Sequence, residues 1–376
     1  MIKILLLIDY ASEFDRKLLK GLVQFSKENG PWLFYRLPSY YKKVHGIKGV
    51  IQFAKKWKAD AIIGQWDAEK DSILDSLKIP VILQNYHHRS TKYSNITGDY
   101  KGTGLMAAQF FIRRRFSNFA YFGIKDVVWS DERMQGYKQE IERVGGTYYS
   151  FESNKTEDEI RADVSKWLKS LPKPIALFCC DDEQALFISE LCYIENLKIP
   201  DDISLLGVDN DNLICNISDP PISSIELEVE KGGYAVGRRV YQLITKEEKG
   251  PFNIVVNPIR IELRQSTEKH NIKDMYVLEM VKYIEANYKS DLSIDDLIAH
   301  YPLSRRNIEI RFKRAMNTTI YQFLLNCRID HFADLLITTN RPIIDLSIEV
   351  GFKDYNNISR LFKKYKGCSP AEYRKK

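Results

Sequence analysis

Polar side chains recur directly after short apolar runs in the first 268 residues of this 376-residue chain. Because the carboxyl ends of parallel strands meet at one edge of a sheet, side chains in such positions converge. Carboxylates, amides and arginine bind vicinal hydroxyls, and an aromatic ring covers the apolar face of a sugar. A single acidic loop is more often a cap or a turn, but the recurrence favours a binding site. The sequence therefore predicts a sugar site drawn from Asp9, Asp15, Arg16, Asn85, Trp129, Arg133, Asp181 and Asp209.

A second candidate constellation is the basic segment from Leu303 to Arg314. Ser304 is a good helix cap, and Ile308 and Phe312 lie four residues apart, on one face of the expected helix. A short helix with one buried stripe and several exposed arginines fits a DNA major groove. The alternative is a solvated basic surface helix. The arginines in question are Arg305, Arg306, Arg311 and Arg314.

Composition and charge place these two constellations in different domains. The length predicts two or three domains. Residues 271–376 hold 18 Lys and Arg against 13 Asp and Glu, whereas the preceding 270 residues are nearly neutral, so only the last quarter is suited to a polyanion. The six cysteines are scattered, which indicates reduced thiols, and the apolar run 4–8 is too short for a signal peptide or a membrane span. We therefore expect a cytoplasmic protein.

The elements that must position the sugar site are alternating strands and helices. Repeated β-α units of this kind predict an open α/β fold with parallel sheets. The expected strands are 4–8, 61–63, 81–83, 119–122, 175–178 and 203–206, and the main expected helices are 104–115, 132–144, 156–170 and 183–196.

Four ordered motifs resemble the sugar-binding core of LacI-type repressors. They are Arg133-Met134-Gln135-Gly136-Tyr137, Asp182-Glu183-Gln184-Ala185, the stretch 199–210 and Arg264-Gln265-Ser266-Thr267. The resemblance implies a two-lobed domain, similar to periplasmic sugar-binding proteins, that closes on a ligand. It also implies that Arg133 and Asp209 bind sugar hydroxyls and that Asp181 contacts the ligand. LacI-type repressors begin with a DNA-binding helix-turn-helix, whereas this sequence starts at the first strand of the core.

Beyond a polar linker at 269–274, the sequence predicts helices throughout. Ser293 caps one helix, Pro302 interrupts, and the basic helix follows, which is a helix-turn-helix arrangement. After a longer helix the pattern repeats, with a turn at Gly351-Phe352 and a polar helix up to Lys364. Two such units could place recognition helices in successive major grooves.

This C-terminal section resembles the AraC-type double helix-turn-helix domain. The resemblance is strongest in Val350-Gly351-Phe352, Ser359-Arg360-Leu361-Phe362-Lys363-Lys364 and Ser369-Pro370-Ala371-Glu372-Tyr373. In this interpretation Arg305, Arg306 and Asn307 approach bases in one groove, and Tyr355, Asn356 and Asn357 do so in the next. Lys363 and Lys364 meet phosphates, and Arg311 and Arg314 serve the DNA backbone or the fold. The complete predicted DNA-binding set is Ser304, Arg305, Arg306, Asn307, Arg311, Lys353, Tyr355, Asn356, Asn357, Arg360, Lys363 and Lys364.

The order of the two domains resembles that of bacterial xylose regulators. The expected architecture is an α/β two-lobed periplasmic-binding-protein-like sensor at 1–268, the linker 269–274 and an all-α double helix-turn-helix DNA-binding domain at 275–376. The resemblance implies a pentose effector, first of all D-xylose, activation of sugar-utilisation genes, a homodimer on direct half-sites of double-stranded DNA, and RNA polymerase as a further partner. No membrane partner is expected.

Other chemistry finds less support in the sequence. His87-His88 lacks a partner at metal-ligand spacing, and Gly98, Gly102 and Gly104 match no nucleotide-binding fingerprint, so we expect neither metal nor cofactor. No Gly-x-Ser-x-Gly elbow supports a hydrolase. The alternatives that stay open are a sugar-processing enzyme and a plain sugar-binding protein, each with a C-terminal regulatory appendage. Turnover of a pentose would favour the enzyme, and a lack of salt-dependent DNA binding would favour the plain binding protein.

Overall fold

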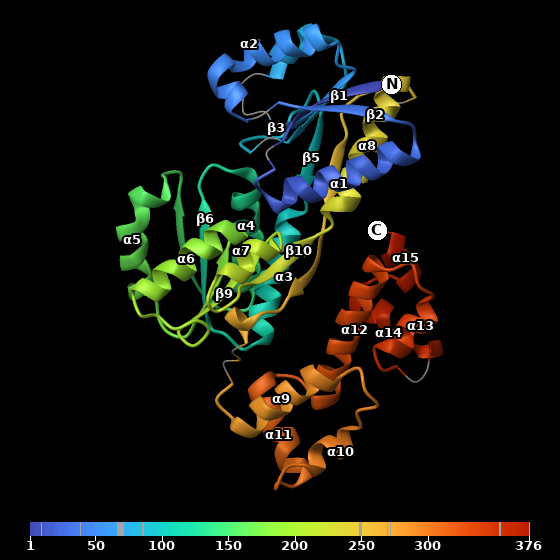
Figure 1. Ribbon diagram of the computed structural model, residues 1–376. Helices are drawn as coiled ribbons and strands as arrows, with labels where there is room; N and C mark the ends of the chain where they lie inside the picture. The colour runs from blue at the N-terminus through green and yellow to red at the C-terminus, as the bar shows by residue number, and fades with distance from the viewer. Residues whose placement is uncertain are drawn as a thin grey trace. The chain divides into compact units, whose positions relative to one another are not determined.

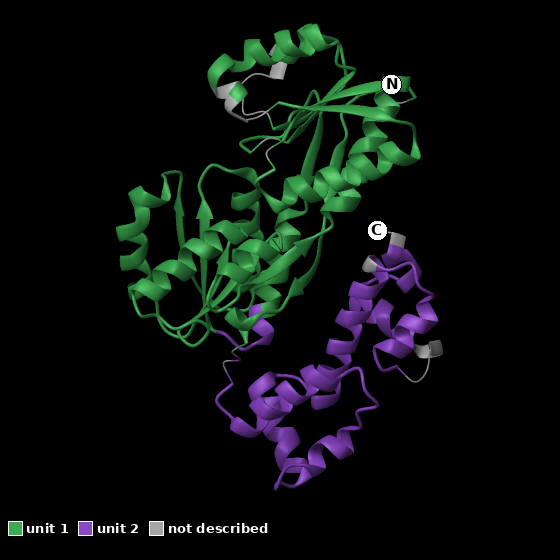
Figure 2. Cartoon of the chain, in the orientation of Figure 1, with its two compact units in different colours: residues 1–110, 117–269 green, residues 111–116, 270–376 purple. Residues whose placement is uncertain are grey.

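A computed structural model gives the fold of the chain as two compact units. The structure describes residues 1–8, 10–37, 39–65, 71–84, 86–247, 250–268, 270, 272–352 and 355–375, and it leaves out the side chains of residues 39, 40, 42, 43, 71–73, 338, 355–357 and 375. Unit 1 comprises 1–110 and 117–269, and unit 2 comprises 111–116 and 270–376 (Figure 2).

Unit 1 contains two six-stranded sheets, which we call lobe 1 and lobe 2 together with their helices (Figure 1). The lobe 1 sheet has the order β11-β5-β4-β3-β1-β2, and its neighbouring strands are parallel. Its strands are β1 (Ile2–Leu7), β2 (Trp32–Arg36), β3 (Ala61–Gln65), β4 (Val81–Gln84), β5 (Ser94–Gly98) and β11 (Asn253–Val256).

The lobe 2 sheet has the order β12-β10-β9-β8-β6-β7, and only the β10–β12 pair is antiparallel. Its strands are β6 (Asn118–Ile124), β7 (Thr147–Ser153), β8 (Ile175–Cys179), β9 (Ile203–Val208), β10 (Ser223–Leu227) and β12 (Pro258–Glu262). The chain passes between the lobes after β5, after β10 and after β11. The predicted two-lobed α/β fold with crossovers is thus confirmed.

Helices flank both sheets because the central strands are apolar on both faces. Every residue of β8 and β9 is buried, so each face of the sheet needs a helical cover. The helices are α1 (Glu13–Glu28), α2 (Ser39–Trp57), α3 (Tyr100–Arg113), α4 (Val128–Arg143), α5 (Glu157–Ser170), α6 (Asp182–Ile194), α7 (Asn212–Ile217) and α8 (Val229–Thr245), with 3-10 turns η1 (Asp71–Leu77) and η2 (Gln265–Thr267).

Two glycines fix the position of α4. A Cβ atom on Gly104 of α3 would lie 2.0 Å from the carbonyl oxygen of Arg133, and one on Gly136 would lie 2.1 Å from that of Lys101. The backbones of α3 and α4 therefore touch, and only glycine permits this approach. The crossing holds Arg133 at the carboxyl edge of the lobe 2 sheet.

The helices of unit 2 surround two separate apolar cores. The first core includes Ile308 and Phe312, and the second includes Ile358 and Phe362. The helices are α9 (Met275–Asn287), α10 (Ile294–Ala299), α11 (Arg305–Met316), α12 (Ile320–Thr338), α13 (Ile343–Glu349), α14 (Tyr355–Lys366) and α15 (Pro370–Lys375). The helix-turn-helix units α10–α11 and α13–α14 contribute one to each core, which confirms the predicted all-α fold of this section.

The predicted caps of the first helix-turn-helix unit are confirmed. The Ser293 hydroxyl accepts hydrogen bonds from the backbone N–H groups of Asp295 and Asp296, 3.2 and 3.3 Å away. The Ser304 hydroxyl accepts from the N–H of Asn307 at 3.4 Å and so begins α11. Each cap satisfies amide groups that the first turn of a helix leaves without partners.

Candidate functional site

Asp181 and Asp182 organise the carboxyl edge of the lobe 2 sheet. Asp181 follows β8 and caps α6, because its Oδ1 accepts a hydrogen bond of 2.7 Å from the N–H of Gln184. Asp182 is buried, and it accepts from the Ser224 hydroxyl at 2.6 Å and from the N–H of Asp211 at 2.8 Å. Asp182 therefore joins three elements of the sheet edge, whereas Asp181 is only partly buried.

Arg133 and Asp209 form the polar centre of the site. Their closest atoms, Nη2 and Oδ1, are 3.7 Å apart, and Arg133 also donates a 2.5 Å hydrogen bond to the carbonyl of Cys180. Within the described part of the chain, Arg133 Nε and Asp209 Oδ1 are buried without a hydrogen-bond partner. A donor and an acceptor left open side by side suit the hydroxyl groups of a polyol ligand.

The backbone of the Asp209 turn is strained. Asp209 has a φ angle of 100° and Asn210 one of 51°, in a region that side-chain-bearing residues rarely adopt. The surroundings hold this conformation: Asp209 donates its N–H to Ile225, Asn210 donates to the Ser224 hydroxyl, and the Asn210 side chain accepts from Arg264 at 2.7 Å. Strain that is held in this way often marks a functional turn.

Aromatic rings enclose the Arg133 guanidinium. Its carbon lies 5.3 Å from the centre of the Trp129 ring and 5.5 Å from that of Tyr100. Arg89 lies 5.7 Å from the same Tyr100 ring and forms two hydrogen bonds with Glu132, of 2.6 and 2.8 Å. The rings fix the arginine by cation–π contact and add the flat apolar surface that a sugar ring needs.

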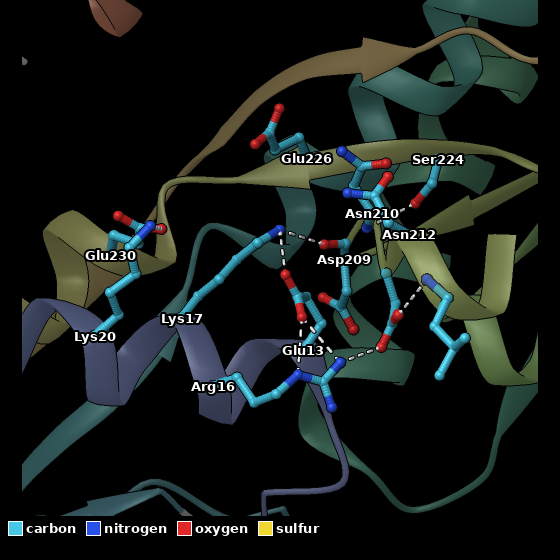
Figure 3. A network of polar contacts seen from close by, with 12 residues as sticks. Glu13, Arg16, Lys17, Lys20, Asp209, Asn210, Asn212, Ser224, Glu226 and Glu230 are labelled. Atoms are coloured by element: carbon cyan, nitrogen blue, oxygen red, sulfur yellow. Dashed lines mark hydrogen bonds and ion pairs between the residues drawn. The ribbon is translucent and has the colours of Figure 1, made fainter. Parts of the chain in front are cut away.

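Helix α1 of lobe 1 contributes the facing side of the site (Figure 3). Arg16 forms a 2.7 Å ion pair with Asp211 of lobe 2, and Lys17 donates to the Asp209 carbonyl at 3.1 Å. Asp15 is buried and accepts from Gln65, whose amide also contacts the Tyr86 hydroxyl. Charged groups from both lobes therefore meet at the Asp209 turn.

Burial changes the protonation of the acidic residues. Desolvation raises the pKa of Asp181 to about 7 and that of Asp182 well above its ordinary value. Desolvation also raises the pKa of Asp209, against the opposing effect of Arg133 and Lys17. A protonated carboxyl group can donate a hydrogen bond, whereas an ionised carboxylate only accepts. Near neutral pH the Asp181 side chain can therefore serve as a donor or as an acceptor for a ligand.

The structure brings most of the sequence-predicted sugar residues together. Trp129, Arg133, Asp181 and Asp209 lie at the edge of lobe 2, and Asp15 and Arg16 face them from lobe 1. Asp9 and Asn85 lie outside the described residues. Sequence reasoning missed several participants. The acidic run 207–211 and the four-residue spacing of Glu13 and Lys17 are signals that could have indicated two of them. The missed residues are Lys17, Gln65, Arg89, Tyr100, Glu132 and Asp211.

The predicted DNA-binding residues lie on α11 and α14, and their surroundings differ. Arg305 contacts Asp295 and Glu309, and Arg311 forms two hydrogen bonds of 2.8 and 2.9 Å with Asp274. In the described part of the chain, no hydrogen bond or ion pair engages the Arg306 side chain. The remaining predicted residues with described side chains are exposed, namely Ser304, Asn307, Arg360, Lys363 and Lys364.

The start of α14 is only partly described. Tyr355, Asn356 and Asn357 form its first turn, as backbone, and Lys353 lies outside the described residues. Among the residues that the structure describes, no group of acidic, histidine or cysteine side chains could hold a metal ion, and no helix is long and apolar enough to cross a membrane.

Comparison with known proteins assigns both domains. Residues 108–267 match a periplasmic binding protein-like domain, and residues 297–376 match a helix-turn-helix domain. The xylose operon regulatory protein of Escherichia coli (strain K12) is 23% identical over 99% of this chain and 96% of that protein. The protein of the same description from Haemophilus influenzae is 24% identical over 99% and 98%.

Solved structures show the same fold. The xylose-binding transcription activator xylR aligns with a TM-score of 0.61 and 21% identity, covering 99% of this chain and 97% of that one. The transcriptional regulator CelR in complex with cellobiose aligns with a TM-score of 0.61 and 20% identity, covering 70% of this chain and 84% of that one.

The chain is therefore a DNA-binding transcription regulator that joins a sugar-sensing, periplasmic-binding-protein-like domain to an AraC-type helix-turn-helix domain. Its domains and relatives are those of regulators and not those of an enzyme. Over nearly its whole length it is similar to the xylose operon regulatory proteins.

Proposed function

We propose that this regulator responds to a pentose, D-xylose, and activates genes for its use. The observation that carries the proposal is the pair of open hydrogen-bonding groups on Arg133 and Asp209, with two aromatic rings against the Arg133 guanidinium. A compact ligand rich in hydroxyls fits this chemistry. The choice of xylose is supported by full-length relatives that are described as xylose operon regulatory proteins.

The proposed effector ligands come from both lobes. In lobe 2, Arg133 and Asp209 bind hydroxyls, Asp181 contacts the ligand and Trp129 covers the ring. In lobe 1, Arg16 and Asp15 lie opposite, and Asp9 and Asn85 stay candidates. Arg16 already pairs with Asp211, so a sugar that engages either residue changes a contact between the lobes. The binding energy of the sugar can in this way select one arrangement of the lobes.

For the DNA-reading part we propose a homodimer that binds direct half-sites of double-stranded DNA. The sensor covers residues 1–268, the linker 269–274 and the DNA-binding domain 275–376. Base contacts come from the first turns of α11 and α14, and RNA polymerase is the further partner through which activation acts. Because its DNA and polymerase partners lie in the cytoplasm, we propose that the protein works there.

A thermal-shift panel of pentoses and hexoses on the purified full chain tests the effector. A ligand that binds only the native state raises the melting temperature by mass action. All five tryptophans lie between residues 32 and 167, so tryptophan fluorescence reports the sensor alone. We expect D-xylose to stabilise the sensor more than other pentoses. Stabilisation by hexoses alone would reject the pentose.

A footprint on promoter DNA with and without the stabilising sugar tests regulation. We expect protection of two successive major grooves per half-site, which changes with the sugar. Loss of both Arg305 and Arg306 through substitution by alanine should alter the footprint if these residues read bases. An unchanged footprint in that double variant would overturn their assignment.

A further inference from the structure

Helix α11 carries two rows of side chains on opposite faces. Ile308, Phe312 and Met316 are spaced by four residues and are buried in the first core of unit 2. Arg306, Ile310 and Arg314 have the same spacing, but each is offset by two residues and each is exposed. Because an α-helix has 3.6 residues per turn, an offset of two residues turns a side chain to nearly the opposite face. The row 306–310–314 is therefore the outward face of α11.

The outward row differs electrostatically from the other arginines of the helix. Arg305 and Arg311 are neutralised by acidic neighbours, namely Asp295 with Glu309 and Asp274. For Arg306 and Arg314, the described residues supply no such partner. Ile310 lies between these two charges, and 58% of its surface is exposed. A single exposed isoleucine is ordinary on a protein surface. Here it lies between two arginines for which the described residues supply no acidic partner. Such a surface is chemically suited to a ligand that has both negative charges and apolar groups.

The second helix-turn-helix unit repeats the first with an offset of 50 residues. Ile308 and Phe312 of α11 correspond to Ile358 and Phe362 of α14, and all four are fully buried. By the same offset, Ile310 corresponds to Arg360, which is exposed. The two recognition helices therefore present different chemistry at one structural position, an apolar branched side chain in α11 and a guanidinium in α14.

We propose that Ile310 reads the 5-methyl group of a thymine in the major groove, between Arg306 and Arg314. The thymine methyl is the one apolar group on a base edge, whereas arginine suits the O6 and N7 acceptors of guanine. Arg360 accordingly selects guanine at the equivalent place in the second groove. The DNA segments that α11 and α14 contact within one half-site would then differ in sequence, which fits a half-site that is not palindromic. This inference rests on the proposed entry of α11 into DNA.

Replacement of thymine by uracil tests the inference because it removes only the methyl group. The probe is the duplex that the full-length protein selects from a randomised pool, with each thymine changed to uracil in turn. Burial of one methyl group predicts that one or two substitutions weaken wild-type binding roughly fourfold. The Ile310→Ala variant should lose this sensitivity at those positions and keep its response to every other substitution.

Ile348→Ala is the matched control. Ile348 lies on α13, outside the recognition helices, and is 63% exposed, so it has the same side chain and similar exposure. We expect this variant to keep the wild-type uracil profile. An Ile310→Ala profile identical to that of wild type, or a wild type indifferent to uracil at every position, would overturn the reading of a thymine methyl while leaving sequence-specific DNA binding intact. Failure of the wild type to select any duplex would overturn the proposed function itself, and this inference with it.

Discussion

At the scale of single residues, we predict that Asp209 is required for sugar binding. Its carboxylate faces Arg133, its backbone accepts from Lys17, and its turn adopts a left-handed conformation. Substitution Asp209→Ala removes the open acceptor and leaves Arg133 buried without its closest acid. We expect the variant to lose sugar-induced thermal stabilisation while it still folds, as followed by tryptophan fluorescence.

Asp163→Ala provides the control for that loss. Asp163 is an exposed carboxylate on α5 of the same lobe, and its removal changes the net charge equally. The control should respond to sugar as wild type does. Undiminished stabilisation of Asp209→Ala would show that the ligand lies elsewhere.

A second residue-scale prediction concerns pH. Burial raises the pKa of Asp181 to about 7, whereas an unfolded aspartate titrates near about 4. Between these values the folded protein holds a proton that the unfolded chain has lost, so this group's contribution to the free energy of unfolding falls as pH rises and levels off above about 7. Asp181→Asn cannot titrate, yet it keeps an oxygen for the N–H of Gln184.

The measurement is sensor stability in the absence of sugar, for wild type and Asp181→Asn, from about pH 5 to about pH 8. We expect the stability of wild type relative to the variant to decline across this interval. Because Asp182 and Asp209 titrate in both proteins, their effects largely cancel in the difference. A difference that is constant with pH would contradict the raised pKa.

At this scale the sequence could predict contacts between residues that are close together in the chain, but not contacts between residues that are far apart in it. The Ser304 cap and the buried Ile308–Phe312 pair follow from spacings of three and four residues, which helix geometry fixes. The acidic partner of Arg311 is Asp274, 37 residues away, and Arg16 binds Asp211, 195 residues away, in addition to the nearby Glu13. No local pattern encodes such pairs. For this reason sequence alone could not separate Arg311, which Asp274 engages, from the outward arginines of α11.

At the scale of elements, a continuous apolar run decided which strands the sequence revealed. Strands β5 and β10 are largely buried but are interrupted by serine and asparagine, and neither was predicted. Strands β8 and β9 are buried throughout and appear as continuous apolar runs. Strands β7 and β12 lie at the two ends of the same sheet and are only partly buried, and neither was predicted. The position of an edge strand is set by its neighbour's hydrogen bonds, which sequence patterns do not display.

One element-scale prediction concerns the start of α9. Asp274 caps this helix through the N–H of Val277 and at the same time binds the guanidinium of Arg311 in α11. Asp274→Ala removes both interactions, and loss of a cap alone costs about 1 kcal/mol. We expect faster hydrogen exchange throughout α9 in the full chain, with unchanged exchange in α5 as the internal reference.

Asp274→Asn separates the two roles. The amide retains an oxygen for the cap but loses the charge that holds Arg311. We expect protection of α9 between that of wild type and that of Asp274→Ala. Equal protection in all three proteins would mean that packing of Val277, Met280 and Ile284 alone sets the stability of this helix.

At the scale of the whole molecule, the sequence located the excess positive charge in the last quarter of the chain. The structure refines that observation because it shows which charges are already engaged. Lys366 forms a 2.7 Å ion pair with Asp330, and Arg341 pairs with Glu349. Lys363 and Lys364 are exposed on α14, and the described residues offer them no ion pair. The charge available to a partner is therefore smaller than the formal total, and α11 and α14 carry much of it.

Lys363 and Lys364 should accordingly meet phosphates and not bases. Each phosphate contact releases condensed counterions and contributes about 0.9 to the slope of log affinity against log salt concentration. Joint substitution of both lysines by alanine should lower the magnitude of that slope by about two. It should weaken binding to specific and random duplexes by a similar factor, while sugar-induced stabilisation of the sensor stays unchanged.

The paired substitutions Lys282→Ala and Lys289→Ala provide the control. These exposed lysines of unit 2 lie outside α11 and α14, so their loss removes the same charge and should leave the slope nearly as it is in wild type. A loss of affinity confined to the specific duplex would instead assign Lys363 and Lys364 to base reading.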